Sequence, residues 1–358
     1  MTRPASLGVW RLVFLWSLVL GAWTFPSTAR AAGSRDHLDK PDAWFASTEA
    51  ARLGENILSW QAATGGWPKN TDTTKPFIGE RAKLQGTFDN GATTDELRFL
   101  VRLIGAPATG LARSASNAFT RGLEHILSAQ YTNGGWPQYA PPPANKYHRH
   151  ITFNDNSMAR LMIFLREVAT EKRYEFVARE QRAAAQRAFD RGVDCILRCQ
   201  IKVNGQLTAW CAQHDEIDFR PRPARTFELA SLSGSESVGL TRLLMGIEHP
   251  SPEIVRAVDA AVAWLESAKI SGIELVETKD ADGRQDRVVK NNPAAKPMWA
   301  RFYEIETGRP IFAGRDGVKK YSLAEIEHER RNGYSWLGSW PQTLLEKDYP
   351  AWRRARAK

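Results

Sequence analysis

The chain has 358 residues, and its 49 Lys and Arg outnumber its 40 Asp and Glu, so the formal net charge is +9. This length allows one large domain or two ordinary ones. Three cysteines are too few for a disulfide-built scaffold. The basic residues are scattered among aromatic, glycine and acidic residues instead of forming uninterrupted runs, which favours a structured anionic ligand and argues against nucleic acid.

The first 31 residues have the pattern of a secretory signal peptide. An apolar stretch over residues 13–23 follows basic residues, and residues 29–31 (Ala-Arg-Ala) supply a small-residue cleavage pattern. The apolar stretch is too short to span a membrane. Removal of residues 1–31 takes away three arginines and no acid, so the net charge falls from +9 to +6. We therefore expect a secreted or periplasmic mature protein, residues 32–358, that forms a single domain.

The predicted elements begin with a helix. Apolar residues recur at helical spacing from Ser47 to Trp60, and the Gly-Gly-Trp-Pro that follows ends this helix. After a loop of about 20 residues, long enough to suggest a functional role, Thr93 or Thr94 caps a second helix. The order of helix, loop and helix then returns twice. We expect the later helices over residues 115–130, 157–169 and 176–200, and a further one that begins by 233–237.

These elements follow an internal repeat. ILSWQAATGGWPKN starts at Ile57 and ILSAQYTNGGWPQY at Ile126, while ILRCQIKVNGQLTAW at Ile196 and WLESAKISGIELV at Trp264 are weaker copies. A fixed period indicates one supersecondary unit that is stacked several times. No segment shows sustained two-residue alternation, so strands should be few and short. The sequence therefore predicts an all-α fold, an array of repeated helical hairpins with long loops.

After Ile270 the helical pattern stops. Residues 270–320 are polar, with an expected turn at 280–283 and an expected loop at 290–293. A last helical stretch should start at Tyr321 and end at about Arg331. This tail either caps the array or faces a ligand, and its many Arg, Trp and Tyr residues favour the ligand.

Two aspartates occupy equivalent places in consecutive repeats. Asp89 lies in Thr-Phe-Asp-Asn and Asp155 in Thr-Phe-Asn-Asp-Asn, each directly before a predicted helix. Either one alone is readily explained as a helix cap. Stacked repeats, however, bring equivalent turns to the same end of the array. Two carboxylates with neighbouring amides would then form a hard-oxygen site that suits Ca²⁺.

Four arginines lie beside aromatic residues or glycine in the loops of the second half. A lone arginine is usually a solvated surface residue, but a group of them on one face can bind the carboxylates of a polyanion in bidentate fashion. The four are Arg225, Arg301, Arg315 and Arg330.

Several other residues have two interpretations. His214 is either a conventional base or a hydrogen-bonded turn residue. Cys195 and Cys199 are four apart on a predicted helix, which suits a bridge poorly, whereas pairing of Cys199 with Cys211 stays open beside the alternative of buried thiols. The following rings either stack on sugars or pack in the core: Tyr139, Trp67, Trp136, Trp210 and Trp336.

Taken together, these segments resemble the pectate lyases of polysaccharide lyase family 10, from about residue 46 to 352. The blocks that carry the resemblance are GGWPKN, TFDNGATTDELRFL, GGWPQY, ITFNDNSMARLM, AWCAQHDE, PARTFELASLSGSES, RFYEIETGRPIF, GRDGVKKY and ERRNGYSWLG. The resemblance implies an (α/α) toroid, or incomplete barrel, and Ca²⁺-dependent eliminative cleavage of polygalacturonate. We expect a monomer that binds neither nucleic acid nor membrane.

The resemblance also implies roles for the site residues. Arg315 corresponds to the Brønsted base, with Arg309 and Arg331 close enough in sequence to compete for that role. Three arginines would hold the substrate carboxylates, namely Arg225, Arg301 and Arg330. The Ca²⁺ ligands would be Asp89 and Asp155.

Three rival functions remain at the level of sequence. Gln-x-x-x-Gly-x-Trp also occurs in triterpene cyclases, but the export signal and the lack of an Asp-rich protonating motif argue against that class. A glycoside hydrolase on the same toroid would use Asp89 and Asp155 as acid and base. A non-catalytic protein would bind acidic polysaccharide without cleaving it.

Overall fold

The computed structural model describes residues 33–106, 109–144 and 146–356. The predicted signal peptide, residues 1–31, lies outside the described residues. In the described part, no helix is long and apolar enough to cross a membrane.

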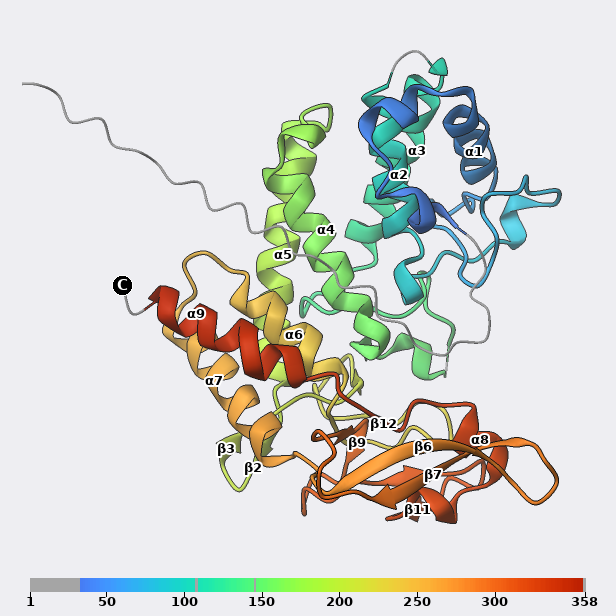
Figure 1. The fold of residues 1–358 in the computed structure, drawn as a ribbon. Coiled ribbons are helices and arrows are strands. Elements are labelled where there is room, and N and C mark those ends of the chain that lie inside the picture. Colours follow the sequence, from blue (N-terminus) through green and yellow to red (C-terminus); the bar gives the residue numbers. More distant parts are fainter. Residues whose placement is uncertain (1–32, 107–108, 145, 357–358) are drawn as a thin grey trace, which may run out of the picture. The chain divides into compact units, whose positions relative to one another are not determined.

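The fold is built from helices joined by long loops (Figure 1). The helices are α1 Thr48–Ser59, α2 Thr94–Ile104, α3 Ala112–Ser128, α4 Ser157–Thr170, α5 Arg179–Cys199, α6 Glu236–Met245, α7 Pro252–Ser267, α8 His328–Asn332 and α9 Tyr349–Arg356. Consecutive helices α2 and α3, α4 and α5, and α6 and α7 pack as hairpins, and α4 also packs against α2 and α6. The predicted array of helical hairpins is therefore confirmed.

Within residues 33–356 as described, the strands form two-stranded antiparallel pairs. The pairs are β1 Ile151–Thr152 with β4 Gln213–His214, β2 Lys202–Val203 with β3 Gln206–Leu207, β5 Leu232–Ser233 with β9 Phe302–Tyr303, β8 Trp299–Ala300 with β12 Leu337–Gly338, β10 Phe312–Ala313 with β11 Lys319–Lys320, and β6 Ile273–Lys279 with β7 Gln285–Asn291. Most are two-residue pairings that fix loops to one another.

Two details of the C-terminal third differ from the sequence prediction. The segment expected to hold only a turn and a loop forms the seven-residue β6–β7 hairpin. Its strands are mostly half-exposed, so polar and apolar residues mix on both faces and no clean alternation marks them. The expected last helix from Tyr321 to Arg331 is instead a 3-10 turn, Leu323–Glu325, followed by the short α8.

The repeated glutamine explains how neighbouring units are joined. Gln61 Nε2 donates to the carbonyls of Gly65 and Ala118, both at 2.8 Å. Gln130 and Gln200 make the same pair of bonds one and two units later, each to its own turn and to the next helix along the array. Each glutamine side chain thus joins its own turn to the next helix of the array through backbone carbonyls.

The repeated tryptophan forms a hydrogen bond inside each unit. Trp67, Trp136 and Trp210 each donate the indole N–H to the carbonyl of the isoleucine that opens their own copy. Trp299 donates its indole N–H to the carbonyl of Leu265, the second residue of the weak fourth copy. These four rings and the ring of Trp336 are all buried. They therefore pack in the core and do not form sugar platforms.

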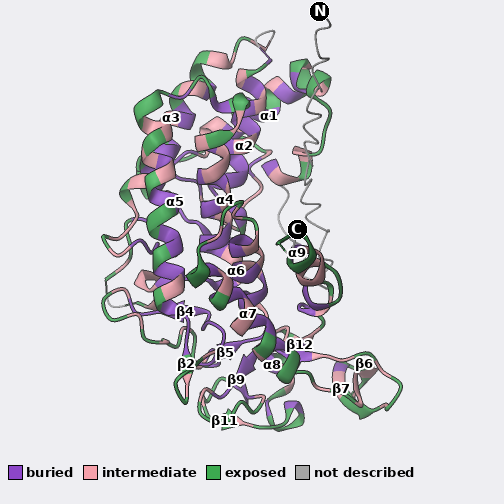
Figure 2. Ribbon diagram, turned by 90° about the vertical axis from the view of Figure 1, so that its left-hand side faces the viewer, coloured by how far each residue is buried: buried purple, intermediate pink, exposed green. Residues whose placement is uncertain are grey.

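The core follows this repeat. Buried residues cover much of α2 and α4, whereas α3 and α5 alternate buried and exposed faces (Figure 2). A second apolar cluster lies among the loops and short strands, around Phe227, Phe302 and Phe312. All three cysteines, Cys195, Cys199 and Cys211, lie in the described part of the chain as buried free thiols, so the open question of a Cys199–Cys211 bridge is answered against it.

Candidate functional site

The two predicted aspartate turns are brought together by the repeat. Asp89 opens the 3-10 turn Asp89–Gly91 and Asp155 lies in the 3-10 turn Asn154–Asn156, directly before α2 and α4. Both turns use left-handed backbone, with φ of 55° at Asn90 and 50° at Asp155, a conformation that Asn and Asp tolerate better than most residues. The turns pack against each other. Neither aspartate is itself the N-cap of its helix, since Thr93 caps α2 and Asn156 caps α4, so the helix-cap interpretation is wrong.

Asp89 is almost completely buried, at 2% exposure. Its Oδ2 accepts a hydrogen bond from Gln138 Nε2 at 2.7 Å and forms an ion pair with Lys69. Its Oδ1 has no hydrogen-bond partner among the described residues. A buried carboxylate oxygen without a partner costs free energy, which is the expected state of a ligand position.

Asp155 is linked directly to one of the predicted arginines. Its carboxylate accepts from Asn154 Nδ2 at 2.7 Å and from Arg301 Nη2 at 3.0 Å. Burial works against its charge, but Arg301 and then Arg225 outweigh this and hold the pKa of Asp155 below its ordinary value. Asp155 is therefore charged at neutral pH.

Arg301 is buried and lies where three acidic or amide groups meet. It contacts Asn154 Oδ1 at 3.2 Å and also pairs with Glu236, a buried residue at the start of α6. Burial alone would lower the pKa of this guanidinium, yet Glu236 raises it well above the ordinary value. Arg301 is thus a fixed positive charge that joins three segments of the chain.

All four predicted arginines gather around two aromatic rings. The guanidinium carbons of Arg225, Arg315 and Arg330 lie 4.8, 5.4 and 4.6 Å from the centroid of the Phe227 ring. Arg225 and Arg301 lie 5.4 and 4.9 Å from that of Tyr334. Cation–π contacts offset part of the repulsion between like charges. We call these residues and the two rings the arginine cluster.

A buried glutamate, Glu228, holds Arg225 in place. Glu228 accepts from Arg225 Nε at 2.7 Å and from the Tyr334 hydroxyl at 2.7 Å. Burial raises the pKa of Glu228, but Arg225 outweighs it and the pKa falls below the ordinary value. Arg225 in turn has its pKa raised by Glu228 against the effect of burial.

Glu329 does the same for two other arginines. It receives Arg315 through Nε at 3.2 Å and Nη2 at 3.1 Å, and it also pairs with Arg330. Arg330 first and Arg315 second lower the pKa of Glu329 to about 2. Arg330 is buried, whereas 61% of the Arg315 side chain is exposed, so Arg315 is the least confined of the four.

Tyr147 and His148 of the second-repeat loop interact electrostatically with both Arg225 and Lys69. The ring centroids of Tyr147 and His148 are 3.9 Å apart, those of Tyr139 and His148 are 5.0 Å apart, and Lys69 Nζ lies 5.5 Å from the Tyr139 ring. Burial lowers the pKa of His148, and Lys69 lowers it further. Tyr139, Tyr147 and His148 are all half-exposed.

Three residues considered from the sequence have other roles. His214 lies in β4, is fully buried and accepts from the Cys211 amide through Nε2 at 3.0 Å, and burial lowers its pKa to about 4, so it is a hydrogen-bonded structural residue. Arg331 is paired with Asp286 through two contacts of 2.8 Å. Arg309 stacks on Tyr321, with 3.8 Å between guanidinium and ring centroid. Among the three neighbouring candidates for the base, only Arg315 belongs to the arginine cluster.

A second acidic group lies nearby but is already neutralised. His150, Asp215 and Glu216 bring potential ligand atoms within 4.8 Å of one another. Glu216 accepts contacts from Arg149 at 2.5 Å and from His150 at 2.9 Å, and Asp215 pairs with Arg222 at 2.6 Å. Arginines thus pair with both carboxylates of this group, as Lys69 does with Asp89.

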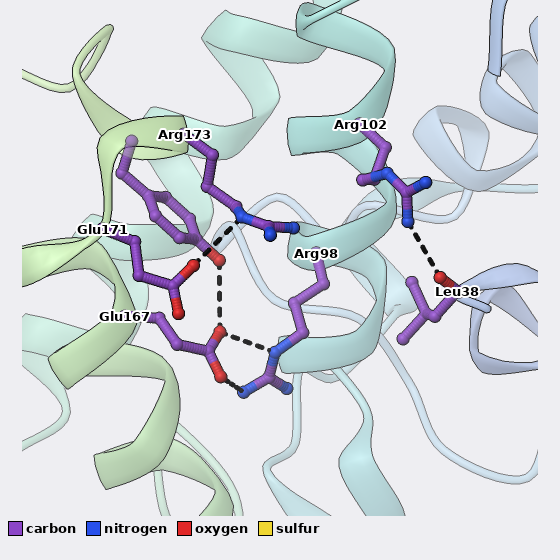
Figure 3. Close-up of a pocket in the computed structure, with 7 residues that line it drawn as sticks. Leu38, Arg98, Arg102, Glu167, Glu171 and Arg173 are labelled. Atoms are coloured by element: carbon purple, nitrogen blue, oxygen red, sulfur yellow. Dashed lines mark hydrogen bonds and ion pairs between the residues drawn. The ribbon is translucent and has the colours of Figure 1, made fainter. Parts of the chain in front are cut away.

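A cavity of about 190 Å³ lies elsewhere, between α2, α4 and the first described residues (Figure 3). Arg98 donates to both Glu167 oxygens at 2.8 Å, and Glu167 also accepts from the Tyr174 hydroxyl at 3.2 Å. Arg102 donates to the carbonyl of Leu38. These groups satisfy one another and join helices, so the cavity has a structural role.

The sequence prediction missed the partners that position the site. Lys69, Glu228, Glu236, Phe227 and Tyr334 were not singled out, although Phe227 to Ser237 lies inside a block already marked by Arg225. Lys69 had one usable signal, because it stands in the first repeat where Gln138 stands in the second.

Comparisons with known proteins show the family to which the chain belongs. A family model described as pectic acid lyase matches residues 61–345. The structure is similar to a family 10 polysaccharide lyase from Cellvibrio cellulosa, with a TM-score of 0.74, 36% identity, and coverage of 87% of this chain and 96% of that one.

A mutant of that lyase, in complex with trigalacturonic acid, matches with the same TM-score and identity and covers 97% of its own chain. No curated protein shows a significant match. The likeness to these solved structures agrees with the expected (α/α) toroid of helical hairpins. The chain therefore belongs to the pectic acid lyases of polysaccharide lyase family 10 and is a pectate lyase.

Proposed function

We propose that this pectate lyase is an exported, monomeric, Ca²⁺-dependent enzyme that cleaves polygalacturonate by β-elimination. The observation that carries the proposal is the direct contact between the two halves of the site, where Arg301 of the arginine cluster donates to Asp155 at 3.0 Å. Positive groups for the substrate carboxylates and negative groups for a cation are thus held side by side. The relative in complex with trigalacturonic acid supports this choice of substrate.

The residues present fit a calcium ion. Asp89 and Asp155 supply carboxylate oxygens, and Asn154 and Gln138 supply neighbouring amides, which is the all-oxygen donor set that Ca²⁺ prefers. The unpartnered Oδ1 of Asp89 is available to such an ion. A bound calcium ion would neutralise a uronate carboxylate while charge develops at the adjacent C5.

The arginine cluster then has two tasks. Arg225, Arg301 and Arg330 hold uronate carboxylates along the chain, because guanidinium groups match carboxylates in bidentate geometry. One arginine takes the proton from C5 as the bond between C4 and the glycosidic oxygen breaks. The departing oxygen is protonated, and the new chain end carries a C4–C5 double bond.

We assign the base to Arg315, as the sequence resemblance implies. An arginine must lose its proton to act as a base, and nearby positive charges favour that loss. Arg315 is also the member least confined by acidic partners. Arg225 is the competing assignment, because it acts on Asp155 and on Tyr147 and so lies nearer the metal side of the site.

Single substitutions separate these assignments by the rate of unsaturated product. Arg315→Ala should abolish elimination, by at least about 10³-fold as removal of an essential catalytic group does, while the fold is retained. Arg225→Ala should mainly raise KM. The control Arg309→Ala, which removes the arginine stacked on Tyr321, should keep near-full rate. The opposite pattern would move the base to Arg225, and near-full rates in both variants would contradict an arginine base.

A further inference from the structure

Two equivalent positions of consecutive repeats converge on one carboxylate oxygen. Lys69 follows Trp67-Pro68 in the first Gly-Gly-Trp-Pro turn, and Gln138 follows Trp136-Pro137 in the second. Both donate to Oδ2 of Asp89. The repeat therefore offers the same contact twice, once as a neutral amide and once as a cation.

The two donors to Asp89 differ in charge, because Lys69 is a cation and Gln138 is neutral. Lys69 Nζ forms an ion pair with Oδ2 of Asp89 and lies 5.5 Å from the centroid of the Tyr139 ring. The lysine side chain is nevertheless 23% exposed, so its amine has a route to solvent.

Oδ1 of Asp89 has no hydrogen-bond partner in the part of the chain that the structure describes, while Oδ2 pairs with the Lys69 ammonium. A divalent cation at Asp89 would lie within a few ångströms of Lys69, and two cations at that distance repel each other strongly where water is excluded. An ammonium also has no lone pair, so it cannot become a ligand of the ion. Cation binding at Asp89 must therefore displace Lys69 or work against it.

We propose that Lys69 is the internal counter-ion of Asp89, which keeps the site assembled without metal and sets the affinity for Ca²⁺ by competing with it. This inference rests on the proposed calcium site. It assigns to Lys69 a role in metal affinity that is separate from any contact with substrate.

Calorimetric titration with CaCl₂ alone, without substrate, tests the proposal on the purified mature protein. Lys69→Met should bind Ca²⁺ at least about tenfold more tightly than the wild type, a change of about 1.4 kcal/mol. In chelator, Lys69→Met should unfold at a lower temperature, because Asp89 is left buried without its partner. Added Ca²⁺ should raise the unfolding temperature more in the variant than in the wild type.

Two further variants complete the design. Lys69→Gln reproduces the amide of the second repeat, so it should fold well and still bind Ca²⁺ more tightly. Lys75→Met is the matched control, since Lys75 lies in the same loop, is 78% exposed and pairs with Asp72 outside the site. It removes the same charge and should change neither the affinity nor the metal-free stability.

The proposal fails if Lys69→Met and Lys69→Gln bind Ca²⁺ no more tightly than the wild type. In that case, if Asp89→Ala has lost Ca²⁺ binding, the proposal of a calcium site at Asp89 still holds. If the wild type and Asp89→Ala bind Ca²⁺ with the same affinity, the proposed calcium site at Asp89 is contradicted. The proposed role of Lys69 is then contradicted as well. The two failures are therefore distinguishable.

Discussion

At the scale of single residues, the site depends on charges that are buried in pairs. Asp89 with Lys69 and Arg301 with Glu236 are each held away from water by their partners. Such pairs contribute little net stability, but loss of one member leaves the other as an uncompensated buried charge. The chain therefore gains fixed geometry at the site more than stability.

Glu96 is a buried acid whose charged form is unfavourable in the folded protein. It accepts hydrogen bonds from Ser34 Oγ at 3.0 Å and from the Thr93 amide at 2.8 Å. Burial first and neighbouring Asp95 second raise its pKa from 4.5 to about 7. A carboxyl group with a raised folded-state pKa is best tolerated when protonated, so its cost to stability grows as the pH rises from 4.5 to 7.

Glu96→Gln should remove this cost. We expect the variant to match the wild type near pH 4.5 and to exceed it above pH 7, by at most about 3 kcal/mol, the free energy of a shift of roughly 2.5 pKa units. Denaturant unfolding across that pH range measures the difference. A constant difference between the two proteins at all pH values would show that Glu96 does not titrate as described.

At the scale of elements, the β6–β7 hairpin supports the helix that carries Arg330. Asp286 on β7 accepts from Arg331 through Nε and Nη2, both at 2.8 Å, and from Asn332 Nδ2 at 2.9 Å. His328, at the other end of α8, forms a 2.8 Å contact with the carbonyl of Gln285. A helix of five residues has little stability of its own, so the hairpin fixes its position.

Asp286→Ala should therefore affect catalysis as well as stability. We expect a loss of about 1–3 kcal/mol in unfolding free energy, as for removal of a partner from charged hydrogen bonds, and a fall of roughly tenfold in kcat/KM as Arg330 loses its support. Asp282→Ala, at the exposed turn of the same hairpin, is the control and should change neither. Unchanged kinetics in Asp286→Ala would show that the hairpin does not position Arg330.

The elements also show which parts of the structure were predictable. Helices that have both a periodic apolar pattern and a capping residue were predictable. An example is the helix that begins after Ser47, whose side chain accepts a hydrogen bond from the Ala50 amide. The neighbouring aspartate turns were predictable because they repeat. The partners of the arginines were not, since Arg301 meets Glu236 across 65 positions of sequence and no local pattern records such a contact. The β6–β7 hairpin was missed because both of its faces are partly exposed.

At the scale of the whole molecule, the repeat and the irregular C-terminal third supply different parts of the proposed site. The repeated glutamine and tryptophan build stacked units and bring Asp89 and Asp155 together. The C-terminal third leaves the repeat and supplies Arg301, Arg315 and Arg330, while the short strand pairs tie its loops to those of the helical part, as β5 does with β9. The proposed lyase site thus needs both parts of the sequence.

The most direct test of this account is incubation of the mature protein with polygalacturonate, with Ca²⁺ or with chelator. Elimination leaves a conjugated double bond at the new chain end, which absorbs in the ultraviolet, whereas hydrolysis leaves saturated ends and a binding protein leaves the polymer intact. We predict ultraviolet-absorbing product with Ca²⁺, its loss in chelator, and its return when Ca²⁺ is added back. Saturated products, intact polymer, or elimination indifferent to chelator would contradict the account.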